Sequence, residues 1–352
     1  MIVPQRELHW DFVKFILMFF IVFGHLCPAG EEWTPVTRII GLFVIPGFFF
    51  VSGYFQSQVK DISGLSRKMK RLFIRIVLPM SSWGGIYVLL SLIQYVFSGE
   101  ISNINDLFQF LKYFPVYIMG IYWFFTALIL CVIFGSFFSF YVENNRFLGV
   151  SLLFMSPILF CITAPTFFEQ YHFSFVWLFY VTGMLYRCTF CKMFSAQRVW
   201  DILLFVIFIV IIVIGVGYEP KHTFYYKSNL IFESSFSFVF FRYILYLAAT
   251  IPVIYGLFRF YQIYKDNQKV VQMASYGADT LFIYCSHVLI LVFLYRPFVL
   301  PCLYHASGGW KACVYEHIVG LIASVLMYLM MQKLCLYFKQ FRLLRVFLMG
   351  EK

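Results

Sequence analysis

Three ionisable side chains within one apolar run are the residues of this sequence best placed to do chemistry. Asp11, Lys14 and His25 interrupt the stretch DFVKFILMFFIVFGH, which is otherwise apolar. Ionisable groups are costly in hydrocarbon, so those inside a membrane span usually face the protein interior and mark a site or a path. A positioned imidazole can take a proton from a weak nucleophile such as a hydroxyl.

The spacing of these residues places them on one face of a helix. The eleven steps from Lys14 to His25 come to ~1100°, about 20° past three full turns. Asp11 lies three residues before Lys14 and shares its face, and the helix rise puts His25 roughly 16 Å from Lys14. The sequence thus predicts an inward stripe with a charged pair near one membrane surface and an imidazole deep in the layer or beyond it. The plainer interpretation is that the pair reaches the cytoplasmic boundary and His25 caps the helix.

The composition is that of an integral membrane protein. The 352 residues are 62% hydrophobic and only 12% charged, whereas a soluble domain carries roughly 25% charged residues. The net charge of +11 comes from short loops between apolar runs, which indicates topology rather than nucleic-acid binding. We predict one membrane domain over residues 1–352, with no appended soluble domain and no nucleic-acid partner.

Apolar runs long enough to cross ~30 Å predict an all-α, polytopic bundle of about ten transmembrane helices. Lys and Arg concentrate in alternate loops if the N-terminus is inside, which predicts that both termini are cytoplasmic. The predicted spans are Trp10–Cys27, Val36–Phe55, Leu72–Phe97, Val116–Tyr141, Phe147–Ile162, His172–Tyr186, Val199–Gly217, Phe236–Phe258, Thr280–Tyr295 and Val314–Phe338.

A basic cluster stands at the entrance to the third predicted span, and its last member, Arg75, lies inside that span. Arg71 and Arg75 are one turn apart on one face, and Arg suits bidentate contacts with phosphate. They are therefore candidates for holding a phosphorylated cofactor that arrives from the cytoplasm. Determination of topology and attraction to anionic lipid also explain such a cluster.

Ser52 lies in the motif PGFFFVSGY at the end of the second predicted span, where Pro46 should kink the helix. A membrane serine hydrolase with His287 as its base is a less favoured interpretation of this Ser, because Phe50 stands where a small residue is usual. Trp123 lies near the outer end of the fourth predicted span, where an aromatic interface belt explains it equally well.

Three further candidates lie in the later spans. Arg242 either pairs with a carboxylate such as Glu233 or faces an anionic substrate. His287, which follows Tyr284, lies ~10 Å into the ninth predicted span. It either bonds to a neighbouring helix or takes part in the chemistry directly.

The cysteines predict no metal site. Cys188 and Cys191 form a single CxxC pair without a partner pair or His, which is weak evidence for zinc. Cys302 and Cys313 share one predicted outer loop, so they form a disulfide or remain free according to the compartment.

These stretches together resemble the acyltransferase-3 family of bacterial membrane O-acyltransferases. That family's first helix carries Arg or Lys, ten residues and then His, as Lys14 and His25 do here. The pattern Pro-x-Phe-Phe-Phe-x-Ser-Gly matches residues 46–53. An Arg-rich loop before a Pro, the Trp123-Phe pair and a Leu-x-x-Tyr-x-x-His helix ending at His287 also match. Lys14 departs from the more usual Arg and loses any bidentate contact.

The resemblance implies a transferase of the bacterial plasma (inner) membrane, with the bilayer, acyl-CoA and a glycan as its partners. It would move an acyl group, most simply acetyl from acetyl-CoA, to a hydroxyl of a surface polysaccharide or lipid-linked sugar. His25 would be the general base or a transient acyl carrier, with Lys14 and Asp11 in the same catalytic stripe. Lys14, Arg71 and Arg75 would hold the donor's phosphates. A glycan or lipid transporter or flippase is the alternative, because it needs a similar polar path.

Overall fold

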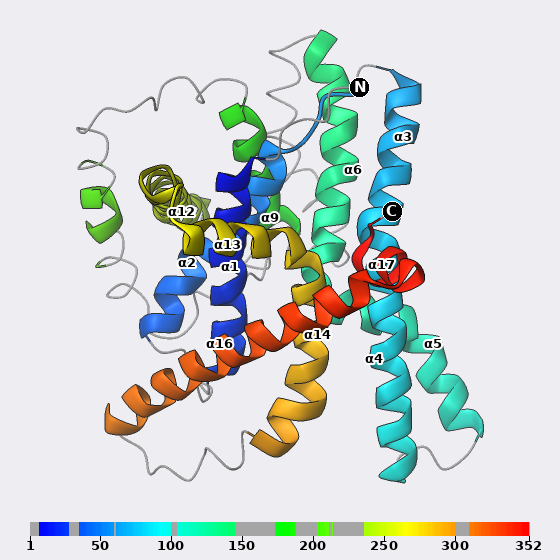
Figure 1. The fold of residues 1–352 in the computed structure, drawn as a ribbon. Coiled ribbons are helices and arrows are strands. Elements are labelled where there is room, and N and C mark those ends of the chain that lie inside the picture. Colours follow the sequence, from blue (N-terminus) through cyan, green and yellow to red (C-terminus); the bar gives the residue numbers. More distant parts are fainter. Residues whose placement is uncertain are drawn as a thin grey trace.

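The protein is described by a computed structural model over residues 7–27, 35–59, 61–99, 104–144, 173–187, 203, 205–210, 213, 236–299 and 310–351. Within these ranges the regular elements are helices and no strand occurs (Figure 1). The all-α prediction is therefore confirmed. Among the described residues, 5 helices are long and apolar enough to cross a membrane. The total of about ten spans and the cytoplasmic placement of both termini stay predictions.

The elements follow one another in three groups along the chain. The first group is α1 (Leu8–Leu26), α2 (Pro35–Tyr54), α3 (Ile62–Leu72), the π-helical η1 (Phe73–Val77) and α4 (Leu78–Phe97). The second is α5 (Ile104–Ile121), α6 (Trp123–Asn144), α9 (Phe173–Leu185) and α12 (Phe236–Tyr264). The third is α13 (Gln268–Tyr276), the short 3-10 turn η3 (Gly277–Asp279), α14 (Thr280–Ile290), the π-helical η4 (Leu291–Val299), α16 (Trp310–Lys339) and α17 (Arg342–Met349).

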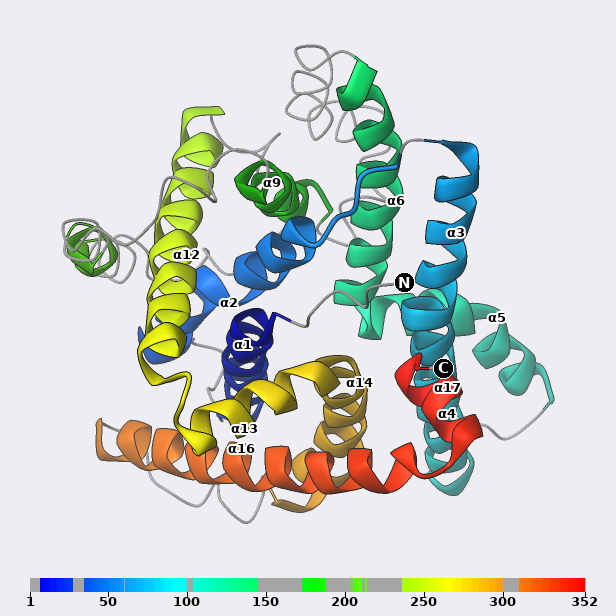
Figure 2. The same cartoon turned by 45° about the horizontal axis from the view of Figure 1, so that its top comes forward.

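Helix α1 is the central element that the sequence predicts. It packs against α2, α12, α13, η3, α14 and α16, which surround it in Figure 2. Its core side chains, among them Val13, Leu17 and Val22, are completely buried. Asp11 is buried with them at 5% exposure. A helix enclosed by protein on several sides can carry polar groups that would be costly against lipid.

Two predicted boundaries differ from the structure. The fourth predicted span, Val116–Tyr141, is divided at Tyr122 into α5 and α6. The Tyr122 ring is fully buried, and its hydroxyl donates to the carbonyl of Cys285 at 3.4 Å, so the chain turns where this side chain enters the core. The helix that contains the third predicted span begins ten residues ahead of that span, because one continuous helical segment runs over residues 62–97.

Asp61 explains the early start of that segment. Its carboxylate accepts a hydrogen bond from the backbone N–H of Gly64 at 2.6 Å and caps α3. The same hydrogen bond holds the pKa of Asp61 below its usual value. Capping residues were not used in placing the spans, and this one marks the true start of the helix.

Two predicted spans are not tested by the structure. The prediction over residues 147–162 lies outside the described residues. That over residues 199–217 is described only at residues 203, 205–210 and 213, which are helical. The other eight predicted spans each overlap a described helix.

Reciprocal glycines hold α2 and α9 in close contact. A Cβ on Gly53 of α2 would collide with the backbone carbonyl of Tyr180, and a Cβ on Gly183 of α9 would collide with that of Phe50. Small residues let membrane helices approach backbone to backbone, where dispersion forces and short polar contacts replace the missing hydrophobic drive. This contact holds α9 directly against α2.

We predict that Gly53→Ala lowers the thermal unfolding temperature of the detergent-purified chain. The added methyl must push the two backbones apart, at a cost of roughly 1–3 kcal/mol or more. Gly256→Ala in α12 is the matched control, because no atom lies within 4 Å of its added Cβ. The control should unfold at the wild-type temperature or above; equal unfolding temperatures for the two variants would contradict the close approach.

Candidate active site

Two histidines from distant parts of the chain meet at the C-terminal end of α1. The ring of His25 faces the ring of His287 in α14, with 5.4 Å between centroids and 35° between planes. The His25 side chain is exposed, whereas His287 is 1% exposed. The structure thus brings together two residues that the sequence nominated separately.

The hydrogen bonding of His287 fixes its tautomer. Its Nδ1 lies 3.2 Å from the carbonyl oxygen of Ile283, one turn earlier in α14. A carbonyl oxygen can only accept, so Nδ1 carries the hydrogen and Nε2 keeps its lone pair. That buried Nε2 has no hydrogen-bond partner among the described residues. Buried polar atoms are rarely left unpaired, which makes this one a candidate for function.

Tyr284 packs against His287. Their ring centroids are 5.3 Å apart in an edge-to-face arrangement. The Tyr284 ring also packs edge-to-face on Phe125 of α6 at 4.6 Å. Trp123, the first residue of α6, is half-buried and packs on Phe124 at 6.3 Å. The two candidates Tyr284 and Trp123 therefore belong to one aromatic cluster beside the histidine pair.

Two residues of η4, Tyr295 and Arg296, complete this end of the site. Neither was a candidate from the sequence. The hydroxyl of Tyr295 donates to the carbonyl of Leu26 at 2.8 Å and ties η4 to the end of α1. Arg296 lies close enough for its charge to act on His25. π-Helical segments are frequent at functional sites, but no sequence pattern used above separates them from ordinary helix. Arg296 was counted only as a charge of an outer loop.

The predicted pairing of Asp11 with Lys14 is present at the other end of α1. Lys14 Nζ lies 2.6 Å from Asp11 Oδ1, and their side chains are 27% and 7% exposed. The ammonium also lies 5.8 Å from the centroid of the Phe55 ring. A Cβ on Gly277 would collide with the carbonyl of Asp11, so η3 lies directly against α1 here.

A second ion pair supports η3 from its other side. Lys339 Nζ in α16 lies 2.6 Å from Oδ1 of Asp279, whose side chain is 7% exposed. Gln332 of α16 donates from Nε2 to the carbonyl of Tyr276 at 3.4 Å. The turn that contacts Asp11 is thereby held by α16. The sequence analysis missed this pair because its members are 60 residues apart in the chain.

The remaining candidates lie away from the histidine pair. Arg71 and Arg75 are exposed on α3 and η1, and these two elements pack against α6. Ser52 is half-buried in α2, two residues before Tyr54, whose ring contacts Trp10 at the opposite end of α1 from His25. Arg242 lies in α12, but its side chain is outside the described residues, as are Cys188, Cys191 and the side chains that would test a Cys302–Cys313 disulfide.

Basic side chains gather instead around the C-terminal end of α2. Lys68 Nζ donates to the carbonyl of Ser57 at 2.8 Å. Arg187 donates to the carbonyls of Tyr54 and Gln56, each at 3.4 Å. Cations near the last carbonyls of a helix satisfy acceptors that lack a helical partner. Together with Lys14, they concentrate positive charge beside the segment 54–57.

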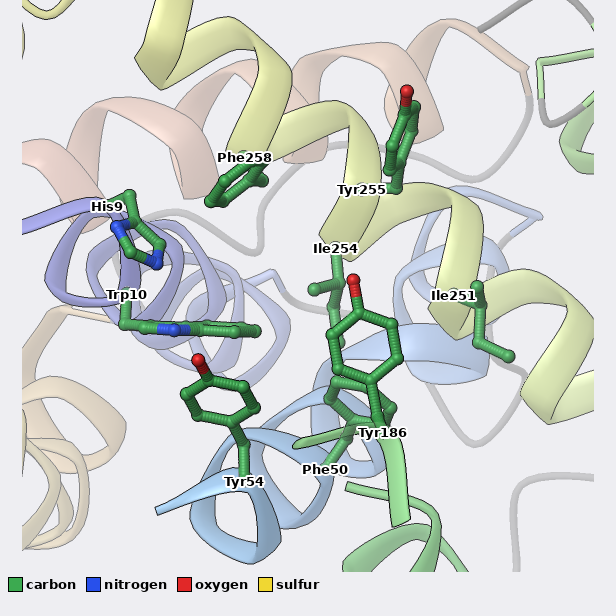
Figure 3. Close-up of a pocket in the computed structure, with 9 residues that line it drawn as sticks. All are labelled: His9, Trp10, Phe50, Tyr54, Tyr186, Ile251, Ile254, Tyr255 and Phe258. Atoms are coloured by element: carbon green, nitrogen blue, oxygen red, sulfur yellow. The ribbon is translucent and has the colours of Figure 1, made fainter. Parts of the chain in front are cut away.

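An aromatic pocket of about 160 Å³ lies next to this basic group. Figure 3 shows the Trp10 ring packed over Tyr54, with Tyr186 and Ile254 on the opposite side. His9, Phe50, Ile251, Tyr255 and Phe258 complete the lining. The pocket is formed by α1, α2, the chain after α9, and α12. It lies at the Asp11 end of α1 and not at the His25 end.

The fold and the site define a helical membrane protein whose first helix carries ionisable groups inside the bundle. Comparison with known proteins assigns the family. The model of the acyltransferase-3 family, described as an acyltransferase domain, matches residues 8–331. The chain belongs to that family, as its motifs predict.

One curated relative shares part of the chain. Nodulation protein NolL of Sinorhizobium fredii (strain NBRC 101917 / NGR234) is 27% identical over 133 residues. The match covers 36% of this chain and 34% of that protein, so the chain spans about a third of the length of the curated relative it matches. No solved structure matches the chain.

We predict that Lys14→Met destabilises the protein more than the double variant with Asp11→Asn. Removing only the cation takes the Lys14 counter-charge from a carboxylate at 7% exposure, and breaking a buried pair costs about 3–5 kcal/mol. Removing both charges relieves most of that penalty. Thermal unfolding of the four members of this double-mutant cycle measures the coupling, and additive effects would mean that the pair contributes nothing to folding.

Proposed function

We propose that this acyltransferase moves an acetyl group from cytoplasmic acetyl-CoA to a hydroxyl of a surface polysaccharide or lipid-linked sugar. Membership of the family supports the transferase class. The observation that carries the proposal is the placement of an exposed imidazole, His25, against a buried one at one end of α1. A sugar hydroxyl is a weak nucleophile at neutral pH, and a positioned imidazole compensates by accepting its proton.

The reaction is a single displacement when His25 acts as the base. The acceptor oxygen attacks the thioester carbonyl carbon while its proton passes to His25. The new C–O bond forms as the C–S bond breaks, and the CoA thiolate then takes that proton from His25 to become the thiol, which restores the neutral imidazole. In the alternative route, His25 itself attacks the thioester and carries the acyl group before the sugar accepts it.

Donor binding is proposed at the opposite end of α1. Lys14 with Asp11 would orient the donor from the cytoplasmic side, and Arg71 and Arg75 would contact its phosphates as part of the exposed basic face of α3 and η1. Lys68 and Arg187 contact the end of α2, and Lys14 lies over Phe55 in the same segment. We therefore add Lys68 and Arg187 to the proposed donor site. The roughly 16 Å helix rise between Lys14 and His25 fits an extended donor arm.

The membrane setting is proposed with the same function. A chain with about ten spans and both termini in the cytoplasm would sit in the bacterial inner membrane as one domain. Acyl-CoA would then reach the Lys14 end from inside, and the glycan would reach the His25 end from outside. Ser52, Trp123 and Arg242 would line the route of donor or acceptor rather than take part in bond making.

We predict that His25→Ala abolishes acetylation of the surface polysaccharide while the polysaccharide is still exported. Loss of a general base costs about 10²–10⁴-fold in rate. Mass spectrometry of polysaccharide from deletion cells carrying either allele measures the acetyl mass on each repeat unit. His317→Ala is the matched control, because His317 of α16 packs on Phe23 of α1, the helix that carries His25, at 6.4 Å.

Three outcomes of this experiment are distinguishable. Acetylation that is lost with His25→Ala and kept with His317→Ala supports the proposal. Polysaccharide that disappears from the surface of the His25→Ala cells would identify a transporter instead. An unchanged glycan mass on deletion of the whole chain would refute acetylation of that polysaccharide.

A further inference from the structure

We infer that His287 is a positioning residue that accepts a hydrogen bond from the imidazole N–H of His25 and so holds His25 in its reactive tautomer. The inference rests on the proposed function, in which His25 receives the acceptor's proton. It assigns a role to a buried group that the proposed reaction does not otherwise use.

The first step is the state of His287 itself. Its Nδ1 donates to the Ile283 carbonyl, which leaves Nε2 as a hydrogen-bond acceptor. This nitrogen is buried and lacks a partner among the described residues. The buried acceptor therefore needs a donor from a side chain or molecule that can reach it.

The second step is the distance to His25. A ring nitrogen lies about 1.2 Å from the ring centre, and a good N–H···N hydrogen bond is about 3 Å long. Two hydrogen-bonded imidazoles therefore have centroids roughly 5 to 5.5 Å apart. The observed separation is 5.4 Å, so a small rotation of the exposed His25 ring would complete the bond without moving either backbone.

The third step is the consequence for His25. A neutral imidazole has one N–H and one lone pair. If its N–H points to His287, its lone pair lies on the opposite edge of the ring, on the exposed side where an acceptor hydroxyl can approach. When that lone pair takes a proton, the resulting imidazolium keeps its hydrogen bond to His287, which stabilises the developing charge.

The surroundings of His287 make it rigid enough to position another ring. Tyr284 packs against it at 5.3 Å, and Tyr284 itself packs against both Phe124 and Phe125. Arg296 is the cation that acts on His25 from η4. An Arg cannot accept a hydrogen bond, so among these groups Nε2 of His287 is the acceptor suited to the His25 N–H.

The activity test compares three substitutions of His287 in deletion cells by the fraction of polysaccharide repeat units acetylated. His287→Gln places an amide oxygen near the position of Nε2 and should retain acetylation within about tenfold of wild type. The Asn side chain of His287→Asn is polar but reaches only the position of Nδ1. Acetylation by this variant should therefore fall to the level of His287→Leu, at least tenfold below that of His287→Gln. Thermal unfolding of each purified chain identifies a variant that simply fails to fold.

The opposite results have definite meanings. A folded His287→Gln as inactive as His287→Leu would overturn positioning and show that His287 itself exchanges a proton. Wild-type acetylation in all three variants would overturn any role for His287. Either result leaves the proposed function intact when His25→Ala is inactive, whereas absence of acetylation by the wild-type chain overturns both proposals.

A second measurement does not depend on activity. Nitrogen-15 NMR of the full chain in lipid nanodiscs reports which ring nitrogen of a histidine carries hydrogen, and the spectrum of His287→Gln assigns the signal. We expect His287 to be protonated at Nδ1 and unprotonated at Nε2, with a shift of the Nε2 signal in His25→Ala when its donor is lost. A hydrogen on Nε2, or no shift in His25→Ala, would contradict the inference.

Discussion

The structure depends on giving partners to the polar groups of α1, because this helix is surrounded by other helices and not by water. Asp11 of α1 is buried, and hydrocarbon offers it no partner. Lys14 on the same helix supplies the counter-charge at 2.6 Å. The turn η3 lies directly against the backbone carbonyl of Asp11. This close approach requires Gly at residue 277, because any Cβ there would collide with that carbonyl. The charge pair and the close backbone contact together fix the depth of α1 in the bundle.

The contrast between satisfied and unsatisfied buried groups separates scaffold from site. Asp11 and Asp279 each have a lysine at 2.6 Å, and both pairs lie around the contact of α1 with η3. His287 is equally buried, yet one of its two ring nitrogens has no partner among the described residues. Fully paired groups hold backbone elements in place. A group left half-paired beside an exposed side chain is available to position that side chain, as we propose for His287 and His25.

The sequence alone predicted the helices well and their contacts only in part. Hydropathy identified α1, α12 and α16, because a long apolar run satisfies its backbone hydrogen bonds in lipid by forming a helix. Helical periodicity also predicted the pairing of Asp11 with Lys14, since both lie on one helix. It could not predict that His25 meets His287, because periodicity gives the face of a helix and not the identity of its neighbour. Lys339 with Asp279 was missed for the same reason.

Other errors had local causes. The break at Tyr122 arises from a side-chain hydrogen bond to the carbonyl of Cys285, a tertiary contact within an otherwise continuous apolar run. Arg296 falls just beyond the end of the ninth predicted span, Thr280–Tyr295, whereas the chain there continues as the π-helical η4 to Val299. Both errors concern residues near the histidine pair, where local patterns are least able to specify the backbone.

Of the two routes proposed for His25, its exposure favours proton transfer over acyl storage. Both routes use the same lone pair, and a hydrogen bond to His287 would stabilise the positive ring formed in either. An acylated imidazole is a reactive species that survives only where water is excluded. His25 is exposed, whereas His287 behind it is 1% exposed. An acyl group on the outer edge of His25 would therefore lie on the open side of the pair, while direct transfer needs only a brief approach of donor and acceptor to that edge.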